Sequence, residues 1–132
     1  MLTNPTSNDH LFVYGTLLRD SAHPMAAFLR QHSTPVGPGW FPGRLYNLGW
    51  YPGAHYEPQS EGKVYGDIVK LTESQIVLAE LDRYEGLDET PPEYSRVLVP
   101  VQTGSGALVC WTYLYRGPVS AGQLIPSGKY SL

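Results

Sequence analysis

Proline and glycine interrupt this chain so often that few stretches are long enough to form a helix. The 132 residues include 12 prolines, 14 glycines and 10 tyrosines. Proline and glycine end helices and favour turns, whereas tyrosine is common in strands. The sequence therefore predicts a mostly β protein, in which short aromatic strands are joined by turns.

Residues 73–85 carry the one strong helix pattern. Thr72 and Gln75 have the spacing of a capping box, and Gly86 is a typical C-terminal stop. An apolar stripe repeats along the segment, and we expect its members to be buried: Val77, Leu78, Leu81 and Tyr84.

A shorter helix is predicted within residues 19–32, with Ser21 as its N-cap and Pro24 in its first turn. Strand-forming runs bounded by turn residues surround the two helices. The expected strands are residues 11–13, 43–48, 62–71, 94–102 and 107–116.

The strand at 62–71 is largely apolar on both faces, which is typical of a central strand, and it should pair antiparallel with 43–48. The sequence TGSG between the last two strands predicts a hairpin. Residues 35–42 and 51–61 are expected as loops, and the turn-rich tail is expected to lie against the sheet. We expect an α+β fold: a small closed or nearly closed sheet with short helices outside it.

Length and charge narrow the class of protein. A chain of 132 residues predicts a single domain, of which residues 1–9 are expected to be flexible. The net charge of −3 argues against electrostatic binding to nucleic acid or to an anionic membrane. A single cysteine suits a reducing compartment, and no signal peptide or membrane-length apolar run is visible. We expect a cytoplasmic monomer or weak homodimer whose partner is a small molecule.

A glycine follows the first strand in the stretch LFVYGTLL. Gly15 either ends the strand in an ordinary tight turn or lets something approach the backbone closely. In the second case the N–H groups of the turn would form an anion site for a carboxylate or phosphate. The stretch alone leaves both interpretations open.

Glu85 is the second candidate for chemistry. Counting by fours from Val77 passes Leu81 and reaches Glu85, which places it at the edge of the buried face. The helix C-terminus and partial burial both disfavour a carboxylate charge, so its pKa is expected to rise, as a general acid/base requires. The alternative is an exposed glutamate on a fraying last turn beside Arg83.

The other reactive residue types are weaker candidates. Cys110 lies in an apolar strand and is expected to be a packing residue. The four histidines have no metal-ligand spacing, so neither a metal nor a cofactor is implied. Tyr94, Tyr113 and Tyr115 either belong to the core or line a pocket.

Four short motifs in order resemble the γ-glutamylcyclotransferase-like family, which includes γ-glutamylamine cyclotransferase and small bacterial proteins. They are FVYGTL, YPG, LDRYEG and YSRVLVPV, and the resemblance covers about residues 11–116. It implies a small mixed β-barrel with flanking short helices and no cofactor.

The resemblance also implies roles for particular residues. The turn that binds the α-carboxylate and amine end of a γ-glutamyl group maps onto Tyr14, Gly15, Thr16 and Leu17, and the catalytic glutamate onto Glu85. Further residues are expected in or beside the pocket: Pro52, Gly53, Tyr94, Arg96 and Tyr115.

The activity implied is cyclisation of a γ-glutamyl amine or peptide. The α-amine attacks its own side-chain carbonyl, which gives 5-oxoproline and a free amine, with Glu85 as general acid/base. The alternative is a non-catalytic domain that senses or carries a small carboxylate in the same pocket, although such a domain has no need of Glu85. An oligonucleotide-binding barrel is disfavoured by the acidic balance. The sequence does not determine the identity of the leaving amine.

Overall fold

The computed structural model describes residues 8–15, 24–49 and 51–130. Its helices and strands follow the chain in this order: β1 (His10–Val13), α1 (Pro24–Gln31), β2 (Ser33–Asn47), β3 (Pro52–Tyr56), β4 (Lys63–Leu71), α2 (Ser74–Tyr84), β5 (Tyr94–Thr103) and β6 (Gly106–Tyr115). A short 3-10 helix, Ala121–Gln123, follows in the tail. Neither helix of the described part is long and apolar enough to cross a membrane.

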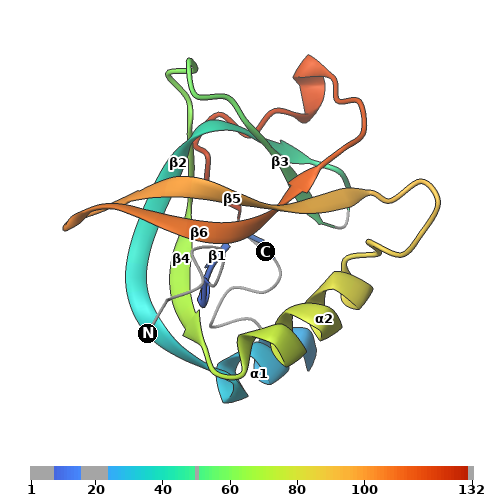
Figure 1. Ribbon diagram of the computed structural model, residues 1–132. Helices are drawn as coiled ribbons and strands as arrows, with labels where there is room; N and C mark the ends of the chain where they lie inside the picture. Colours follow the sequence, from blue (N-terminus) through green and yellow to red (C-terminus); the bar gives the residue numbers. More distant parts are fainter. Residues whose placement is uncertain (1–7, 16–23, 50, 131–132) are drawn as a thin grey trace.

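The strands form a barrel (Figure 1). Their order is β3-β2-β4-β1-β6-β5, and β5 returns to β2 where Trp40 pairs with Gln102. Neighbouring strands are antiparallel except β1 and β6, which are parallel at Leu11 and Trp111. The predicted mixed β-barrel with flanking helices is confirmed.

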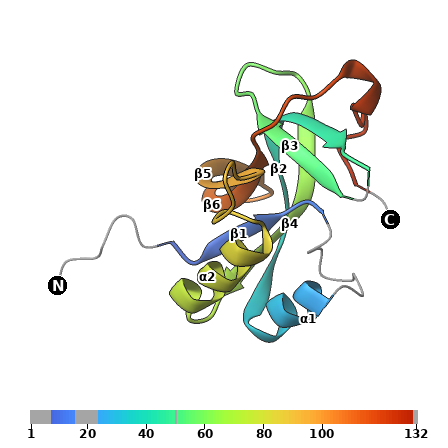
Figure 2. The ribbon, with the colours of Figure 1, turned by 90° about the vertical axis from the view of Figure 1, so that its right-hand side faces the viewer.

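Alternating residues of β1 separate two apolar clusters. Leu11 and Val13 pack towards the helices, and Phe12 and Tyr14 pack on the opposite face, inside the barrel. Both helices lie at the same end of the barrel (Figures 1 and 2). The helix-side cluster includes one residue of α1 and three of α2: Leu29, Val77, Leu78 and Leu81. Burial against β1 therefore fixes the position of α2.

The predicted strand at 43–48 is confirmed as far as residue 47 as the second part of β2, whereas the expected loop at 35–42 is wrong, because it forms part of the same continuous strand. Its first part, up to Pro42, pairs with β4, and its second part pairs with β3. The first part is hydrogen-bonded along β4 and meets β5 at one residue, so prolines that lack an N–H are tolerated there. A bulge between Pro35 and Gly37 absorbs the irregularity.

The expected loop at 51–61 contains strand β3, which the sequence analysis missed. Pro52 is the first residue of this strand, a position where proline is acceptable in a sheet. The strand brings Pro52 opposite Asn47 of β2.

Helix α2 agrees with its predicted bounds, but its first turn does not. The capping box is absent, because Thr72 donates its hydroxyl to the carbonyl of His32 at 3.0 Å, and the N-cap residue is Glu73, with φ of 50°. Gly86 ends the helix with φ of 76°, as predicted. Tyr84, expected to be buried, is 40% exposed because it lies on the last turn.

Other local predictions are confirmed. Pro24 is the first residue of α1, and β5 and β6 form the predicted hairpin. The tail lies against the sheet through Ile125, whose N–H donates to Leu45. Ser21 and residues 1–7 lie outside the described residues, whereas Asn8 donates its side-chain amide to the carbonyl of Val109 at 2.7 Å.

Candidate active site

A cavity of about 230 Å³ lies between β1 and the end of α2. Its inner walls are buried residues of β1, β5 and β6: Leu11, Phe12, Val13, Tyr94, Thr112 and Tyr113. Tyr14, Gly15 and Pro52 also line it. The remaining lining residues lie nearer solvent: Tyr51, Tyr84, Glu85 and Glu93. The cavity is therefore apolar inside and acidic toward its opening.

Glu85 lines this cavity from the C-cap of α2, where its N–H donates to Leu81 at 2.8 Å. Burial, followed by repulsion from Glu93, raises the pKa of Glu85 from 4.5 to about 7. The direction of this shift agrees with the sequence prediction, and the sequence analysis missed the contribution of Glu93. Arg83 pairs instead with Glu80 at 2.9 Å, so Glu85 is not the exposed partner of Arg83.

Tyr14 ties three strands together behind the cavity. Its hydroxyl donates to the carbonyl of Tyr113 on β6 and accepts the N–H of Ala54 on β3 at 3.2 Å. Burial, with Glu85 nearby, raises the pKa of Tyr14 far above its ordinary value, so the phenol stays neutral. Both bonds are intramolecular, and they give the Tyr14 hydroxyl a structural role in the cavity wall.

Gly15 is where a side chain would collide with Pro52. A Cβ at Gly15 would lie 2.7 Å from Cγ of Pro52, and Gly15 is not among the glycines with positive φ. Close approach, not an unusual backbone conformation, therefore explains the glycine. Thr16 and Leu17 lie outside the described residues, so the anion-binding turn stays a prediction.

Tyr94 and Tyr51 hold the wall opposite β1. The hydroxyl of Tyr94 donates to the carbonyl of Pro52 at 2.7 Å, and that of Tyr51 donates to Glu93 Oε2 at 2.5 Å. The bond to Glu93, more than burial, raises the pKa of Tyr51 to about 12. Burial raises the pKa of Tyr94 far above its usual range. Both phenols are therefore neutral hydrogen-bond donors.

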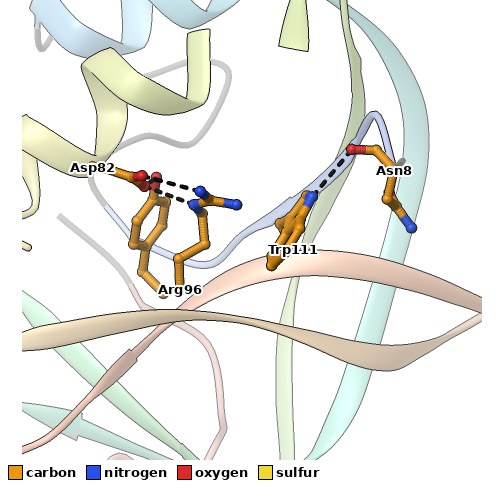
Figure 3. A network of polar contacts seen from close by, with 5 residues as sticks. Asn8, Asp82, Arg96 and Trp111 are labelled. Atoms are coloured by element: carbon orange, nitrogen blue, oxygen red, sulfur yellow. Dashed lines mark hydrogen bonds and ion pairs between the residues drawn. The ribbon is translucent and has the colours of Figure 1, made fainter. Parts of the chain in front are cut away.

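Arg96 was expected in or beside the pocket, but it does not line the cavity. Its Nε and Nη2 donate to the two carboxylate oxygens of Asp82 at 2.7 and 3.1 Å (Figure 3). This pairing holds the guanidinium away from the cavity lining. Asp82 also accepts the hydroxyl of Tyr113 at 2.7 Å, and Arg96 stacks on Trp111, 4.3 Å from its ring centre. These contacts attach the last turn of α2 to β5 and β6 and thereby position Glu85.

Gly53 and Tyr115 also lie outside the lining. The Tyr115 ring is stacked on His55 and packs edge-on against Tyr94, with ring centres 6.3 and 5.8 Å apart. A Cβ at Gly53 would lie 2.7 Å from Cβ of Tyr115, so the two residues pack directly together. They therefore pack against Tyr94, which lines the cavity, and do not line it themselves.

Tyr51, Tyr84 and Glu93 are the lining residues near solvent that the sequence analysis did not assign to the site. Glu93 directly precedes Tyr94, which was expected in or beside the pocket. This proximity was the one sequence signal that could have assigned Glu93 to the site. Cys110 is buried in the barrel, where burial raises the pKa of its thiol to about 12, as expected of a packing residue. Among the described residues, no three His, Cys, Asp or Glu side chains group as metal ligands.

The model of the family "Gamma-glutamyl cyclotransferase, AIG2-like" matches residues 11–132. The chain belongs to this family. No curated protein matches the AIG2-like chain significantly in sequence.

Solved structures agree with the family. An AIG2-like protein from Mus musculus is 25% identical, with a TM-score of 0.71 over 93% of this chain and 88% of that one. The protein ytfP from Escherichia coli is 31% identical, with a TM-score of 0.62 over 92% and 95%. YkqA from Bacillus subtilis is 25% identical, with a TM-score of 0.74, and the match covers 94% of this AIG2-like chain but 40% of YkqA.

Proposed function

We propose that this protein is a cofactor-independent γ-glutamyl cyclotransferase that converts a γ-glutamyl amine or peptide into 5-oxoproline and a free amine. The observation that carries the proposal is the carboxyl group of Glu85, which lines the cavity with a pKa raised to about 7. Membership of the family supports the reaction class. We place the reaction in the cytoplasm, because a lone buried cysteine suits a reducing compartment.

The proposed reaction makes one bond, breaks one and moves two protons from the α-ammonium nitrogen to the departing nitrogen. Glu85 takes the first proton from the α-ammonium group, and the freed α-amine nitrogen attacks the side-chain amide carbon to form the five-membered ring. Glu85 gives that proton to the departing nitrogen as the bond from the carbon to this nitrogen breaks. Glu85 then takes the second proton from the ring nitrogen and passes it to the released amine, so the carboxylate is regenerated and the amine leaves as an ammonium ion.

A pKa near 7 suits both halves of this transfer. A carboxylate of ordinary pKa would be a weak base for an ammonium group, whereas a raised pKa improves the base and still allows the acid to release its proton. Because both reactants belong to one molecule, the protein mainly has to hold the substrate in a ring-closing shape. The hydrogen bonds of Tyr14 and Tyr94 fix the cavity walls, and fixed walls favour holding the substrate in one shape.

The γ-glutamyl end is proposed to bind at the turn after β1. Backbone N–H groups from Gly15 onward would receive the α-carboxylate, as the family resemblance implies. This arrangement would place the α-amine toward Glu85, on the opposite side of the same cavity.

The test is release of 5-oxoproline from a panel of γ-glutamyl amines and peptides. We expect turnover of at least one compound by the native protein and a loss of about 100-fold or more in Glu85→Gln. Glu61→Gln is the matched control, because Glu61 is exposed, lies between β3 and β4 and does not line the cavity. It should retain native turnover.

Ligand binding decides between enzyme and carrier. If no panel compound yields 5-oxoproline, while calorimetry detects binding that is equal in native protein and Glu85→Gln, the chain is a non-catalytic binding domain. Loss of turnover with retained binding in Glu85→Gln supports the proton-transfer role.

A further inference from the structure

The opening of the cavity carries a second carboxylate whose role the proposed reaction does not explain. Glu93 is exposed and lines the cavity from the residue before β5, whereas Glu85 is only partly exposed. Proton transfer needs one acid/base, and Glu85 supplies it. Glu93 is therefore available for binding.

Glu93 is held in place at this opening. The Tyr51 hydroxyl donates to one of its oxygens at 2.5 Å, and the Tyr51 ring lies 6.4 Å from that of Tyr94, centre to centre. A carboxylate accepts several hydrogen bonds, so the bond from Tyr51 orients Glu93 without exhausting its capacity. A carboxylate beside aromatic rings is a common environment for an ammonium group.

The walls of the cavity indicate the direction in which the leaving amine of a bound substrate extends. The amide that reacts must lie at Glu85, and the buried residues of β1 and β6 close the inner side of the cavity. The leaving amine therefore extends toward the exposed side, where Glu93 and Tyr51 lie. Among the described lining residues, Glu93 is the charged one on this side besides Glu85.

The charge of the lining favours one class of leaving group. Its charged side chains within the described part of the chain are Glu85 and Glu93, both acidic. An anionic leaving group would be repelled, a neutral one would gain nothing, and a cationic one would be attracted.

We propose that Glu93, oriented by Tyr51, forms a subsite for a positively charged group on the leaving amine. The preferred substrates are γ-glutamyl amides of a diamine or polyamine, in which the leaving amine carries a further ammonium group. The proposal rests on the cyclotransferase function and adds to it the chemical class of the substrate.

Three substrates of matched length test it: the γ-glutamyl amides of 1,4-diaminobutane, n-butylamine and 4-aminobutyrate, which end in a cation, a methyl group and an anion. The measured quantity is kcat/KM for 5-oxoproline release. Native protein should prefer the cationic over the neutral amide by about fivefold, as one partly exposed ion pair allows, and should use the anionic amide least.

Glu93→Gln should reduce the cationic-to-neutral ratio to about one, and Glu93→Lys should reverse it. The ratio is informative because any change in the basicity of Glu85 affects all three substrates alike. Glu61→Gln, which makes the same change in net charge outside the cavity, should keep the native ratio. The native preference should also weaken as ionic strength rises.

The outcomes separate the two proposals. Equal kcat/KM for all three amides, or a ratio that Glu93→Gln does not change, overturns the subsite and leaves the cyclotransferase standing. If Glu93 held the α-ammonium group instead, Glu93→Gln would weaken all three substrates equally, which also overturns the subsite. Absence of 5-oxoproline from all three, while another γ-glutamyl compound of the panel yields it, overturns the subsite alone, and absence from the whole panel with folded native protein overturns both proposals.

Discussion

Asp82 and Glu85 are carboxylates one helical turn apart on α2, and their surroundings are opposite. Asp82 receives three hydrogen bonds, two from Arg96 and one from Tyr113. Glu85 lies against the cavity with another acid, Glu93, as its main charged neighbour, and burial raises its pKa to about 7. One carboxylate is compensated and fixes the helix, whereas the other is uncompensated and suited to exchange a proton.

The two roles depend on each other. An uncompensated carboxylate lowers stability, and it keeps its position only if the surrounding structure holds it there. The Asp82–Arg96 pair supplies that support at the same end of α2. Replacing each acid by its amide should therefore change stability in opposite directions.

The largest effect is expected for Asp82→Asn, which leaves the mostly buried Arg96 without a carboxylate. The free energy of unfolding should fall by about 3 kcal/mol, measured by urea denaturation at pH 7. Glu80→Gln is the control, because it breaks the exposed pair with Arg83 and should cost less than about 1 kcal/mol. Equal losses in the two variants would contradict the distinction between a supporting and a surface pair.

Glu85→Gln should stabilise the protein by about 2 kcal/mol at pH 8. The pKa of Glu85 is about 7 in the folded protein, against an ordinary value of 4.5, so the folded state holds the proton more tightly. Native stability should therefore fall as pH rises from about 4.5 to about 7, and the variant lacks this loss. Parallel stability curves for the two proteins across pH 4.5–8 would contradict the raised pKa.

Arg96→Lys should reduce kcat about tenfold and leave KM within about twofold, measured by steady-state release of 5-oxoproline. Lysine keeps the charge but cannot donate two parallel hydrogen bonds to Asp82, so Glu85 loses its exact placement while the cavity lining stays intact. Arg44→Lys is the control, since Arg44 pairs with Glu57 at 3.5 Å on the surface. A rise in KM alone would instead assign Arg96 to substrate binding.

The smallest effect is expected for Glu93→Gln on the pH profile. With Glu85 as the base, kcat/KM rises with pH through the pKa of Glu85. Removing the Glu93 charge lowers that pKa, so the acidic limb should shift to lower pH. The shift is modest because burial is the larger cause of the raised pKa. An unchanged limb would mean that Glu93 does not influence Glu85.

Local patterns made α2 predictable and placed Glu85 at its end, although they left the exposed alternative for Glu85 open. The 3.6-residue repeat of Val77 and Leu81 lies within one segment, and the stop at Gly86 needs no information from elsewhere in the chain. The β5–β6 hairpin was predictable for the same reason, since its turn is local. These elements contain the groups that the family resemblance assigns to catalysis.

Strands rich in proline were not predictable in this way. The first part of β2 resembles a loop in sequence because it contains Pro35, Pro38 and Pro42, and β3 resembles one because it begins with Pro52. Whether a missing N–H is tolerated depends on which neighbours a strand has, and that is decided by barrel closure rather than by local sequence.

The acidic opening of the cavity could not be predicted from local sequence patterns either. Tyr51 and Glu93 are 42 residues apart in sequence and meet beside the hydrogen bond from Tyr94 to Pro52. Arg96 was expected beside the pocket, but the choice between a ligand and Asp82 as its partner depends on where α2 crosses the sheet. Sequence patterns predicted that Glu85 lies at the edge of the buried face and missed the residues that set its surroundings.

The central strand β1 also determines when the cavity can first exist. It lies between β4 and β6, and the Tyr14 hydroxyl reaches a carbonyl 99 residues further along the chain. Contacts of such long range form late in folding and slow it. During synthesis, a nascent chain that ends before β6 already contains Glu85 but lacks the part of the cavity wall that Thr112 and Tyr113 form. Activity should therefore appear only after almost the whole chain has left the ribosome.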